Sequence, residues 1–397
     1  MSQIEIHPQA QQNARGETWA IPLRNRHFFL QALFAFLIVF MNLGQGDLSG
    51  YDDAFHAEQA RQILRSGDWW TIEHNGYYNP GFPPLFYWLD ALSMKLWGVN
   101  DFAAKFPSAM LGWGTILAVY FVAWELTGQV WVSLLVMLTL MSTQYFMKYA
   151  THAMTDVPFA FFVTLALLLY LKGFRKPAFF LWTGVAVGLA MLTRPVVGVI
   201  PLGIFLAHLV LTRRYQLLRS WPVLAGLILA LVLPAAWYCA QYRLHGPDAV
   251  FGPLSLMVQQ LTASKRPEIW KILAGTLKYP ELLLKLYWPW LPFMLIGLSR
   301  MARKAWRTPD SMATLLLVWV SAVVLPFSLG EAKQLRYIMP VFPAFAILAA
   351  IPISEWIPPH RRARCLRGLY ALGTAAVVFM FLFPGNLLRA TDMRKLV

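Results

Sequence analysis

Long apolar runs recur along the whole chain and are separated by short polar segments. Each run is long enough to cross about 30 Å of hydrocarbon as a helix. The pattern predicts eleven such segments, at 27–44, 107–126, 130–149, 157–173, 178–193, 195–212, 221–242, 280–299, 311–329, 337–357 and 366–386. A membrane-spanning backbone must satisfy its own hydrogen bonds, and the alternation of a transmembrane barrel is absent from the sequence, so we expect helices. The predicted fold class is an all-α polytopic membrane protein, a bundle of about 11 transmembrane helices.

Two neighbouring runs are short, and they meet at Thr193-Arg194-Pro195. A helical hairpin that dips less than the full depth of the membrane is an alternative there. The predicted number of spans therefore holds to about one.

Lys and Arg gather in the polar segments between the apolar runs. The basic segments are 172–177, 213–219, 300–307 and 361–367, and the amino-terminal tail adds Arg15, Arg24 and Arg26. With eleven spans, all of them fall on one side of the membrane, which the positive-inside rule makes the cytoplasm. We therefore expect a multi-pass protein of the inner (plasma) membrane with a cytoplasmic amino terminus.

The opposite, periplasmic side has an acidic character. The segment 45–106 holds eight of the nineteen Asp and Glu residues. Apolar residues at helical spacing predict two amphipathic helices lying at the membrane interface, joined by an aromatic, turn-rich stretch. The predicted organisation is a cytoplasmic tail 1–26, a transmembrane catalytic domain 27–386 with outer loops 45–106 and 243–279, and a short outer tail 387–397.

The composition supports a membrane protein. Hydrophobic types make up 58% of the 397 residues and charged types only 13%, whereas a soluble domain carries about 25% charge. That excludes a soluble enzyme and a disordered protein. The net charge of +15 arises from cations placed in topological segments, so we expect no nucleic-acid partner. The two cysteines exclude a cysteine-rich metal framework.

Asp52 and Asp53 are the first candidates for chemistry, since they follow Gly50-Tyr51 where the first span leaves the membrane. One interpretation is helix capping, worth about 1 kcal/mol. The alternative is a carboxylate that acts as a general base or binds substrate hydroxyls or a metal. A single cap needs only one carboxylate, which favours the functional interpretation for Asp52.

Asp156 is the second candidate, at the outer start of the fourth span in Thr155-Asp156-Val157-Pro158. Capping is again the alternative, since proline is tolerated in a first helical turn. Two carboxylates on different helices at the same membrane boundary point to function, because carboxylates at membrane depth are costly.

Three cations lie on the translocated side, against the topological bias. They are Arg194, Lys333 and Arg336. Side chains that reach to lipid headgroups would explain them, and so would an anionic partner such as a lipid-linked phosphate.

A divalent metal ion is a further hypothesis. Four histidines are expected near the outer face, namely His56, His74, His152 and His245, and one or two of them would join Asp52 around the ion. Their spacing matches no metal motif, and the sequence contains no HExxH, Walker or GxSxG signature. No cofactor is assigned with certainty.

Several motifs resemble one known family. The strongest stand in the first outer loop: Gly50-Tyr51-Asp52-Asp53-Ala54-Phe55-His56-Ala57-Glu58, Ser66-Gly67-Asp68-Trp69 and Pro83-Pro84-Leu85-Phe86-Tyr87-Trp88. Later motifs are Phe102-Ala103-Ala104-Lys105-Phe106-Pro107-Ser108-Ala109, Thr155-Asp156-Val157-Pro158, Leu192-Thr193-Arg194-Pro195 and Leu335-Arg336-Tyr337-Ile338-Met339-Pro340. From about residue 28 to 357, the chain resembles glycosyltransferase family 39, which includes protein O-mannosyltransferases and the aminoarabinose transferase of lipid A.

The resemblance implies a GT-C type bundle and an inverting transferase that uses a polyprenyl-phosphate sugar donor. It implies that Asp52 is the catalytic base and Asp156 the second catalytic aspartate. The expected substrate-binding residues are Asp53, His56, Arg194, Lys333, Arg336 and Tyr337. The expected partners are the donor, a glycolipid or protein acceptor and membrane lipids.

The chain departs from the family just before the Pro-Pro pair. Family members often carry an acidic residue and a lysine there, whereas this chain has Gly81 and Phe82. The change removes a phosphate contact and a metal ligand that the resemblance would otherwise imply.

A transporter or flippase for a lipid-linked or anionic substrate is the main alternative function. Transporters usually show two related halves and helices broken near the midplane, and the sequence shows no such repeat. A structural assembly protein is a further alternative, against which the two boundary aspartates argue.

Overall fold

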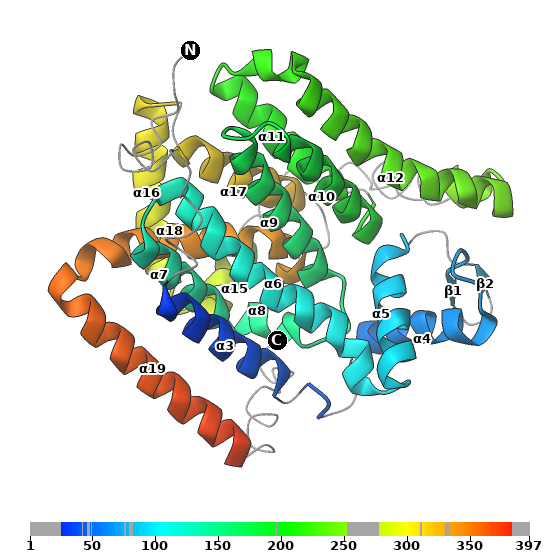
Figure 1. Cartoon of the computed structure of the whole chain (residues 1–397), viewed down its shortest axis with the longest axis horizontal. Coiled ribbons are helices and arrows are strands. Elements are labelled where there is room, and N and C mark those ends of the chain that lie inside the picture. The colour runs from blue at the N-terminus through cyan, green and yellow to red at the C-terminus, as the bar shows by residue number, and fades with distance from the viewer. Residues whose placement is uncertain are drawn as a thin grey trace.

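The computed structural model describes residues 25–41, 43–45, 48, 50–74, 77–78, 82–195, 197–251, 278–309, 312–329 and 334–382. The elements up to the middle of the chain are α3 (Arg26–Phe40), α4 (Tyr51–Ser66), β1 (Glu73–His74), β2 (Tyr77–Tyr78), α5 (Leu85–Trp97), α6 (Asp101–Thr127), α7 (Val130–Met141), α8 (Gln144–Ala150) and α9 (Asp156–Gly173). The remaining elements, where η marks a 3₁₀ helix, are α10 (Phe179–Thr193), η1 (Val197–Val199), α11 (Ile200–Leu211), η2 (Tyr215–Arg219), α12 (Trp221–His245), α15 (Lys278–Leu286), α16 (Leu291–Arg307), α17 (Met312–Leu329), η3 (Leu335–Val341), α18 (Phe342–Trp356) and α19 (Pro359–Leu382). Figure 1 shows these helices gathered into one bundle.

The predicted all-α membrane fold is confirmed. Among the described residues, four helices are long and apolar enough to cross a membrane, namely α6, α9, α12 and the joined η3–α18. Two bent pairs raise this number to six, α7–α8 with a bend of 69° and α16–α17 with a bend of 119°. The predicted spans at 27–44, 178–193 and 195–212 form the shorter apolar helices α3, α10 and η1–α11.

Two predicted spans are each divided between two α-helices. The span 130–149 forms the bent pair α7–α8. The segment 280–299 is divided, because α15 ends at Leu286 and α16 begins at Leu291, and Pro289 stands in the break. The tail at 387–397, most of the outer loop 243–279 and residues 1–24 lie outside the described residues.

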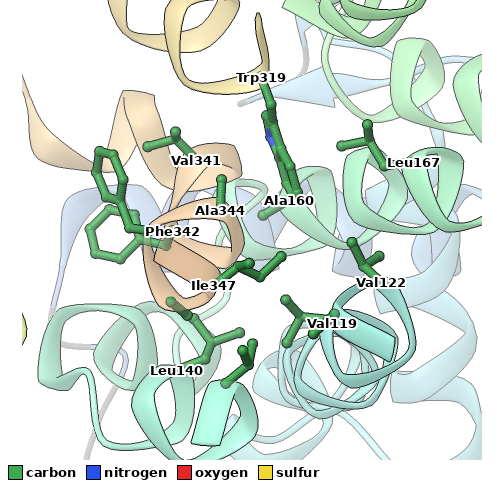
Figure 2. Packing of buried hydrophobic residues seen from close by; sticks show 14 of the residues in the cluster. Val119, Val122, Leu140, Ala160, Leu167, Trp319, Val341, Phe342, Ala344 and Ile347 are labelled. Atoms are coloured by element: carbon green, nitrogen blue, oxygen red, sulfur yellow. The ribbon is translucent and has the colours of Figure 1, made fainter. Parts of the chain in front are cut away.

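The core is formed where α6, α7, α9 and α18 pack side by side. Figure 2 shows Val119 and Val122 of α6 facing Ala160 of α9, with Leu140 of α7 and Ile347 of α18 closing the cluster. All five side chains are fully buried. These four helices form the frame of the bundle, and one of them, α9, begins at Asp156.

Glycines allow α10 and α12 to approach very closely. A Cβ atom on Gly184 would lie 1.8 Å from the carbonyl oxygen of Gly226, which no side chain could tolerate. Small residues are typical of helix contacts in membranes, where close backbone approach replaces the hydrophobic driving force. This contact fixes α10, whose carboxyl end carries Arg194.

The predicted basic segments gather at one end of the bundle. Arg175 forms an ion pair of 3.0 Å with Glu125 at the end of α6. The guanidinium of Arg362 lies 5.5 Å from the ring centroid of Trp131, at the start of α7. Because α9 runs towards the segment 172–177, its amino-terminal end lies at the opposite end of the bundle.

The two predicted amphipathic helices of the first outer loop are α4 and α5, and they pack against each other. The structure adds a feature that the sequence did not reveal, an antiparallel hairpin of β1 and β2 with Glu73 paired to Tyr78. The loop is tied to α12, because the amide nitrogen of Gln241 donates to the carbonyl of Trp70 at 2.8 Å. The loop is therefore a structured cap rather than a linker.

Asp90 of α5 is a destabilising residue within this cap. It is fully buried, and neither carboxylate oxygen has a hydrogen-bond partner among the described residues. Burial raises the pKa of the Asp90 carboxyl well above its ordinary value. The folded state therefore retains a proton that the unfolded state loses as pH rises above about 4.

We expect Asp90→Leu to stabilise the protein by about 1–3 kcal/mol at neutral pH, because it removes an unsatisfied buried polar group. The gain should shrink towards acidic pH, where Asp90 is protonated in both states. Unfolding in detergent at several pH values measures it. A variant that is less stable than the wild type at pH 7 would contradict this interpretation.

Candidate active site at the helix termini

Four segments that begin or end helices meet at the end of the bundle opposite the basic segments. The first turn of α4 brings Asp52 and Asp53, the start of α9 brings Asp156, the end of α10 brings Arg194, and η3 brings Arg336. Ion pairs between these segments join residues far apart in the chain.

Prolines and glycines set these helix ends. A residue that precedes proline is pushed out of the helical region, and Arg194 before Pro195 is extended, with φ −142° and ψ 117°. Gly50 is extended and precedes the first turn of α4. Pro158 lies in the first turn of α9, where its missing N–H costs nothing.

Asp52 forms an ion pair with Arg336 across the site. The Nη1 atom of Arg336 lies 2.6 Å from Oδ2 of Asp52, and the Nε–H of Arg336 donates to Oε1 of Gln334 at 2.5 Å. The side chain of Asp52 is 47% exposed, whereas those of Asp53 and Asp156 are 4% and 0% exposed. Asp52 is therefore the carboxylate of the three that an incoming substrate can reach.

Asp156 forms a second, buried ion pair. The Nη2 atom of Arg194 donates to Oδ1 of Asp156 at 2.8 Å, and its Nε donates to the hydroxyl of Thr155 at 3.1 Å. The other oxygen, Oδ2, is buried and has no hydrogen-bond partner among the described residues. Asp156 is therefore a buried carboxylate fixed by Arg194, behind the part of the site that a substrate can reach.

The side chain of Asp53, the next residue after Asp52 along α4, is buried and faces His152. Its Oδ2 is 3.9 Å from Nε2 of His152, whose Nδ1 lies 2.6 Å from the carbonyl of Lys148. Burial raises the pKa of Asp53, against the positive charge of His152 and Lys105. Burial also lowers the pKa of His152. Each group is thereby driven towards its neutral form, so this contact is a weak ion pair.

The capping alternative is wrong for these aspartates. Gly50 is the N-cap of α4 and Thr155 that of α9, and neither helix has a side-chain capping hydrogen bond. Asp52 and Asp156 instead pair with arginines. The ion pairs likewise explain Arg336 and Arg194 without an appeal to lipid headgroups.

His56 is held in an aromatic cluster. Its Nδ1 shares a hydrogen bond of 2.9 Å with the hydroxyl of Tyr87. Burial, with the nearby Arg194, lowers the pKa of His56 to about 4, so the imidazole is neutral at pH 7. Phe82, at a position where the family often has lysine, packs against the ring of His56 at a centroid distance of 6.1 Å. An apolar wall replaces a cation there.

Two tyrosines of α8 belong to the site although no motif marked them. The hydroxyl of Tyr145 donates to that of Tyr149 at 3.4 Å. Tyr149 in turn lies beside His152, the neighbour of Asp53, with ring centroids 6.2 Å apart. Aromatic residues make up 15% of the chain, so composition gives no signal that separates these two from an interfacial belt.

Two predicted site residues remain, Tyr337 and Lys333. Tyr337 follows Arg336 in η3, and its ring lies 5.7 Å from the guanidinium and stacks on Phe327. Lys333 and Gly81 lie outside the described residues.

The hypothesis of a metal ion gains no support from the described part of the chain. No three His, Cys, Asp or Glu side chains there come close enough together to hold one. His56 and His152, two of the candidate ligands, are engaged with Tyr87 and Asp53. We therefore derive no step through a metal.

Comparison with known proteins identifies relatives of this chain. Residues 27–248 match the family described as dolichyl-phosphate-mannose-protein mannosyltransferase. An uncharacterized protein of Aquifex aeolicus is 31% identical over 332 residues, which are 82% of this chain and 63% of that protein. An undecaprenyl phosphate-alpha-4-amino-4-deoxy-L-arabinose arabinosyl transferase of Aeromonas salmonicida is 27% identical over 393 residues, 91% of this chain and 65% of that protein. The chain thus spans just under two thirds of the length of these relatives.

A solved structure has the same fold. ArnT from Cupriavidus metallidurans bound to undecaprenyl phosphate superimposes with a TM-score of 0.72 at 23% identity, over 88% of this chain and 63% of that one. The bundle is therefore that of a multi-pass GT-C membrane protein, as predicted. The relatives are named as transferases, which does not favour the transporter alternative. The matched segment, residues 27–248, is more than half of the chain. The chain therefore belongs to the dolichyl-phosphate-mannose-protein mannosyltransferase family.

Proposed function

We propose that the chain is a glycosyltransferase that moves a sugar from a polyprenyl-phosphate donor to a hydroxyl or phosphate acceptor, with inversion. The observation that carries this proposal is the position of Asp52, an accessible carboxylate beside the guanidinium of Arg336. The structure of ArnT bound to undecaprenyl phosphate supports a lipid phosphate as the donor class.

The chemistry follows from a good leaving group. The acceptor oxygen attacks the anomeric carbon from the face opposite the phosphate, so the new C–O bond forms as the bond to the phosphate oxygen breaks. The acceptor proton passes to Asp52, and the polyprenyl phosphate departs with the bonding electron pair. A positioned base contributes about 10²–10⁴-fold to such a step. For a phosphate acceptor, which is already ionised, no base is required.

The other site residues position the reactants. Arg336, with Lys333 and Tyr337 beside it in the sequence, holds the departing phosphate, because a guanidinium fork matches phosphate oxygens. Asp156, which is buried and fixed by Arg194, orients the reactants indirectly, because its negative charge helps to hold Arg336 in place. Asp53 and neutral His56 form the wall of the site behind the base.

We propose that the site faces the periplasm and that the amino terminus is cytoplasmic. This sidedness is supported by the basic segments at the opposite end of the bundle, which the positive-inside rule places in the cytoplasm. Residues 27–386 then form the catalytic domain, between the tails 1–26 and 387–397. The acceptor is a glycolipid or a protein.

The test uses the full-length chain in proteoliposomes supplied with polyprenyl-phosphate sugars and a lipid extract. We expect loss of the donor sugar together with formation of a glycosylated acceptor, both detected by mass spectrometry. Movement of an intact lipid-linked substrate across the vesicle membrane without cleavage of the sugar–phosphate bond would instead indicate a flippase. Glycolipids and glycoproteins that disappear from cells lacking the protein identify the acceptor.

A further inference from the structure

Arg336 forms an ion pair with the proposed base, Asp52. Its Nη1 is 2.6 Å from Oδ2 of Asp52, and its Nε is held by Gln334. The side chain of Arg336 is only 16% exposed, against 47% for Asp52. The guanidinium is therefore the fixed partner, and the aspartate is the partner that solvent and substrate can reach.

Arg336 interacts electrostatically with two carboxylates. It forms the ion pair with Asp52, and the negative charge of Asp156 also attracts it. Asp156 has a cation of its own, however, since Arg194 lies 2.8 Å away. If Arg336 turned from Asp52 to another anion, Asp156 would remain paired, and the cost of the change would fall on Asp52 alone.

A carboxylate that is paired to a guanidinium is a weaker base than a free one, because the cation stabilises the ionised form. Two oxygens of a tetrahedral phosphate can accept from the same guanidinium fork. The carboxylate of Asp52 and the donor phosphate therefore compete for the single positive charge of Arg336.

We propose that Arg336 exchanges partners, pairing with Asp52 when the site holds no donor and with the donor phosphate when the donor binds, so that donor binding releases the base. This inference rests on the proposed function and adds an order of events to it. The donor binds first, Asp52 is freed to receive the acceptor proton, and Arg336 returns to Asp52 when the polyprenyl phosphate leaves. Without donor, the carboxylate is neutralised and withheld from other hydroxyls.

The exchange predicts a measurable coupling between two substitutions. If Asp52 and the phosphate compete for Arg336, removing the charge of Asp52 must tighten phosphate binding. This tightening must disappear when Arg336 is replaced. We expect Asp52→Asn to strengthen the binding of undecaprenyl phosphate to the purified full-length protein by about fivefold or more, the lower end of such couplings. Arg336→Gln should weaken it, and in the Arg336→Gln background Asp52→Asn should have no further effect.

Glu58→Gln is the matched control. It removes a negative charge from the same helix, α4, at a carboxylate that pairs with Arg61 rather than Arg336, and we expect no tightening. Equal tightening by Glu58→Gln, or tightening by Asp52→Asn that persists without Arg336, would mean simple repulsion between anions and overturn the exchange. If Arg336→Gln does not fold, Arg336→Met completes the cycle, because it likewise removes the charge and the N–H donors of Arg336.

The experiment separates this inference from the function on which it rests. If the wild type binds undecaprenyl phosphate and Asp52→Asn does not change the affinity, the exchange is overturned but the proposed donor class is not. No measurable binding of undecaprenyl phosphate to any folded variant would overturn the proposed donor class, and the exchange with it.

Discussion

Replacement of Asp52 by Asn is expected to lower the rate of sugar transfer by about 10²–10⁴-fold, the usual contribution of a positioned general base. Asn has nearly the same shape and keeps an oxygen that can accept from Arg336, but it cannot take a proton. Single-turnover transfer from a polyprenyl-phosphate sugar in proteoliposomes measures the loss free of product release.

Glu58→Gln again provides the matched control for this prediction. The carboxylate of Glu58 pairs with Arg61 on α4 and takes no part in the proposed site, so we expect the variant to retain most of the transfer rate. Both variants should keep the thermal stability of the wild type to within a few degrees. A folded Asp52→Asn protein that transfers sugar at the wild-type rate would refute the assignment of the base.

Loss of Arg194 is expected to have the largest effect on stability. Arg194→Met leaves Asp156 fully buried without its cation, and breaking a buried ion pair from one side costs about 3–5 kcal/mol. Unfolding in detergent by a chemical denaturant measures the difference in free energy.

A second substitution distinguishes the lost pair from lost packing. In the double variant Arg194→Met with Asp156→Asn, no unpaired charge remains, so most of the lost stability should return. The double variant should nevertheless transfer sugar slowly, because the proposed orienting carboxylate is gone. A double variant as unstable as Arg194→Met alone would show that packing, and not charge, sets the effect.

Much of the fold could be predicted because a membrane imposes simple rules. Apolar length marks helices, and the positions of Lys and Arg sort the two ends of the bundle. The ion pair of Arg175 with Glu125 lies at the end of the bundle where the basic segments gather. The division of the predicted span 280–299 was missed, because apolar composition continues across the break at Pro289. The hairpin of β1 and β2 was missed because its strands have only two residues each.

The sequence identified the candidate site residues one by one, but it did not show which of them form ion pairs with one another. Asp52 and Asp156 stood out because carboxylates are costly at a membrane boundary. Their partners could not be assigned, since Arg336 is 284 residues from Asp52 and Arg194 is 38 from Asp156. Only the packing of α4, α9, α10 and η3 decides which arginine meets which aspartate. Tyr149 carried no signal at all, since tyrosine is common at any membrane interface.

The central claim is that Asp52 removes a proton from the acceptor, and the acidity of the acceptor hydroxyl tests it most directly. A more acidic hydroxyl depends less on a base in the transition state. Transfer to a series of alcohols of increasing acidity should therefore be measured for the wild type and for Asp52→Asn under single-turnover conditions. We predict that the defect of Asp52→Asn shrinks steadily as the acceptor becomes more acidic. A defect of the same size for every acceptor would contradict proton removal by Asp52.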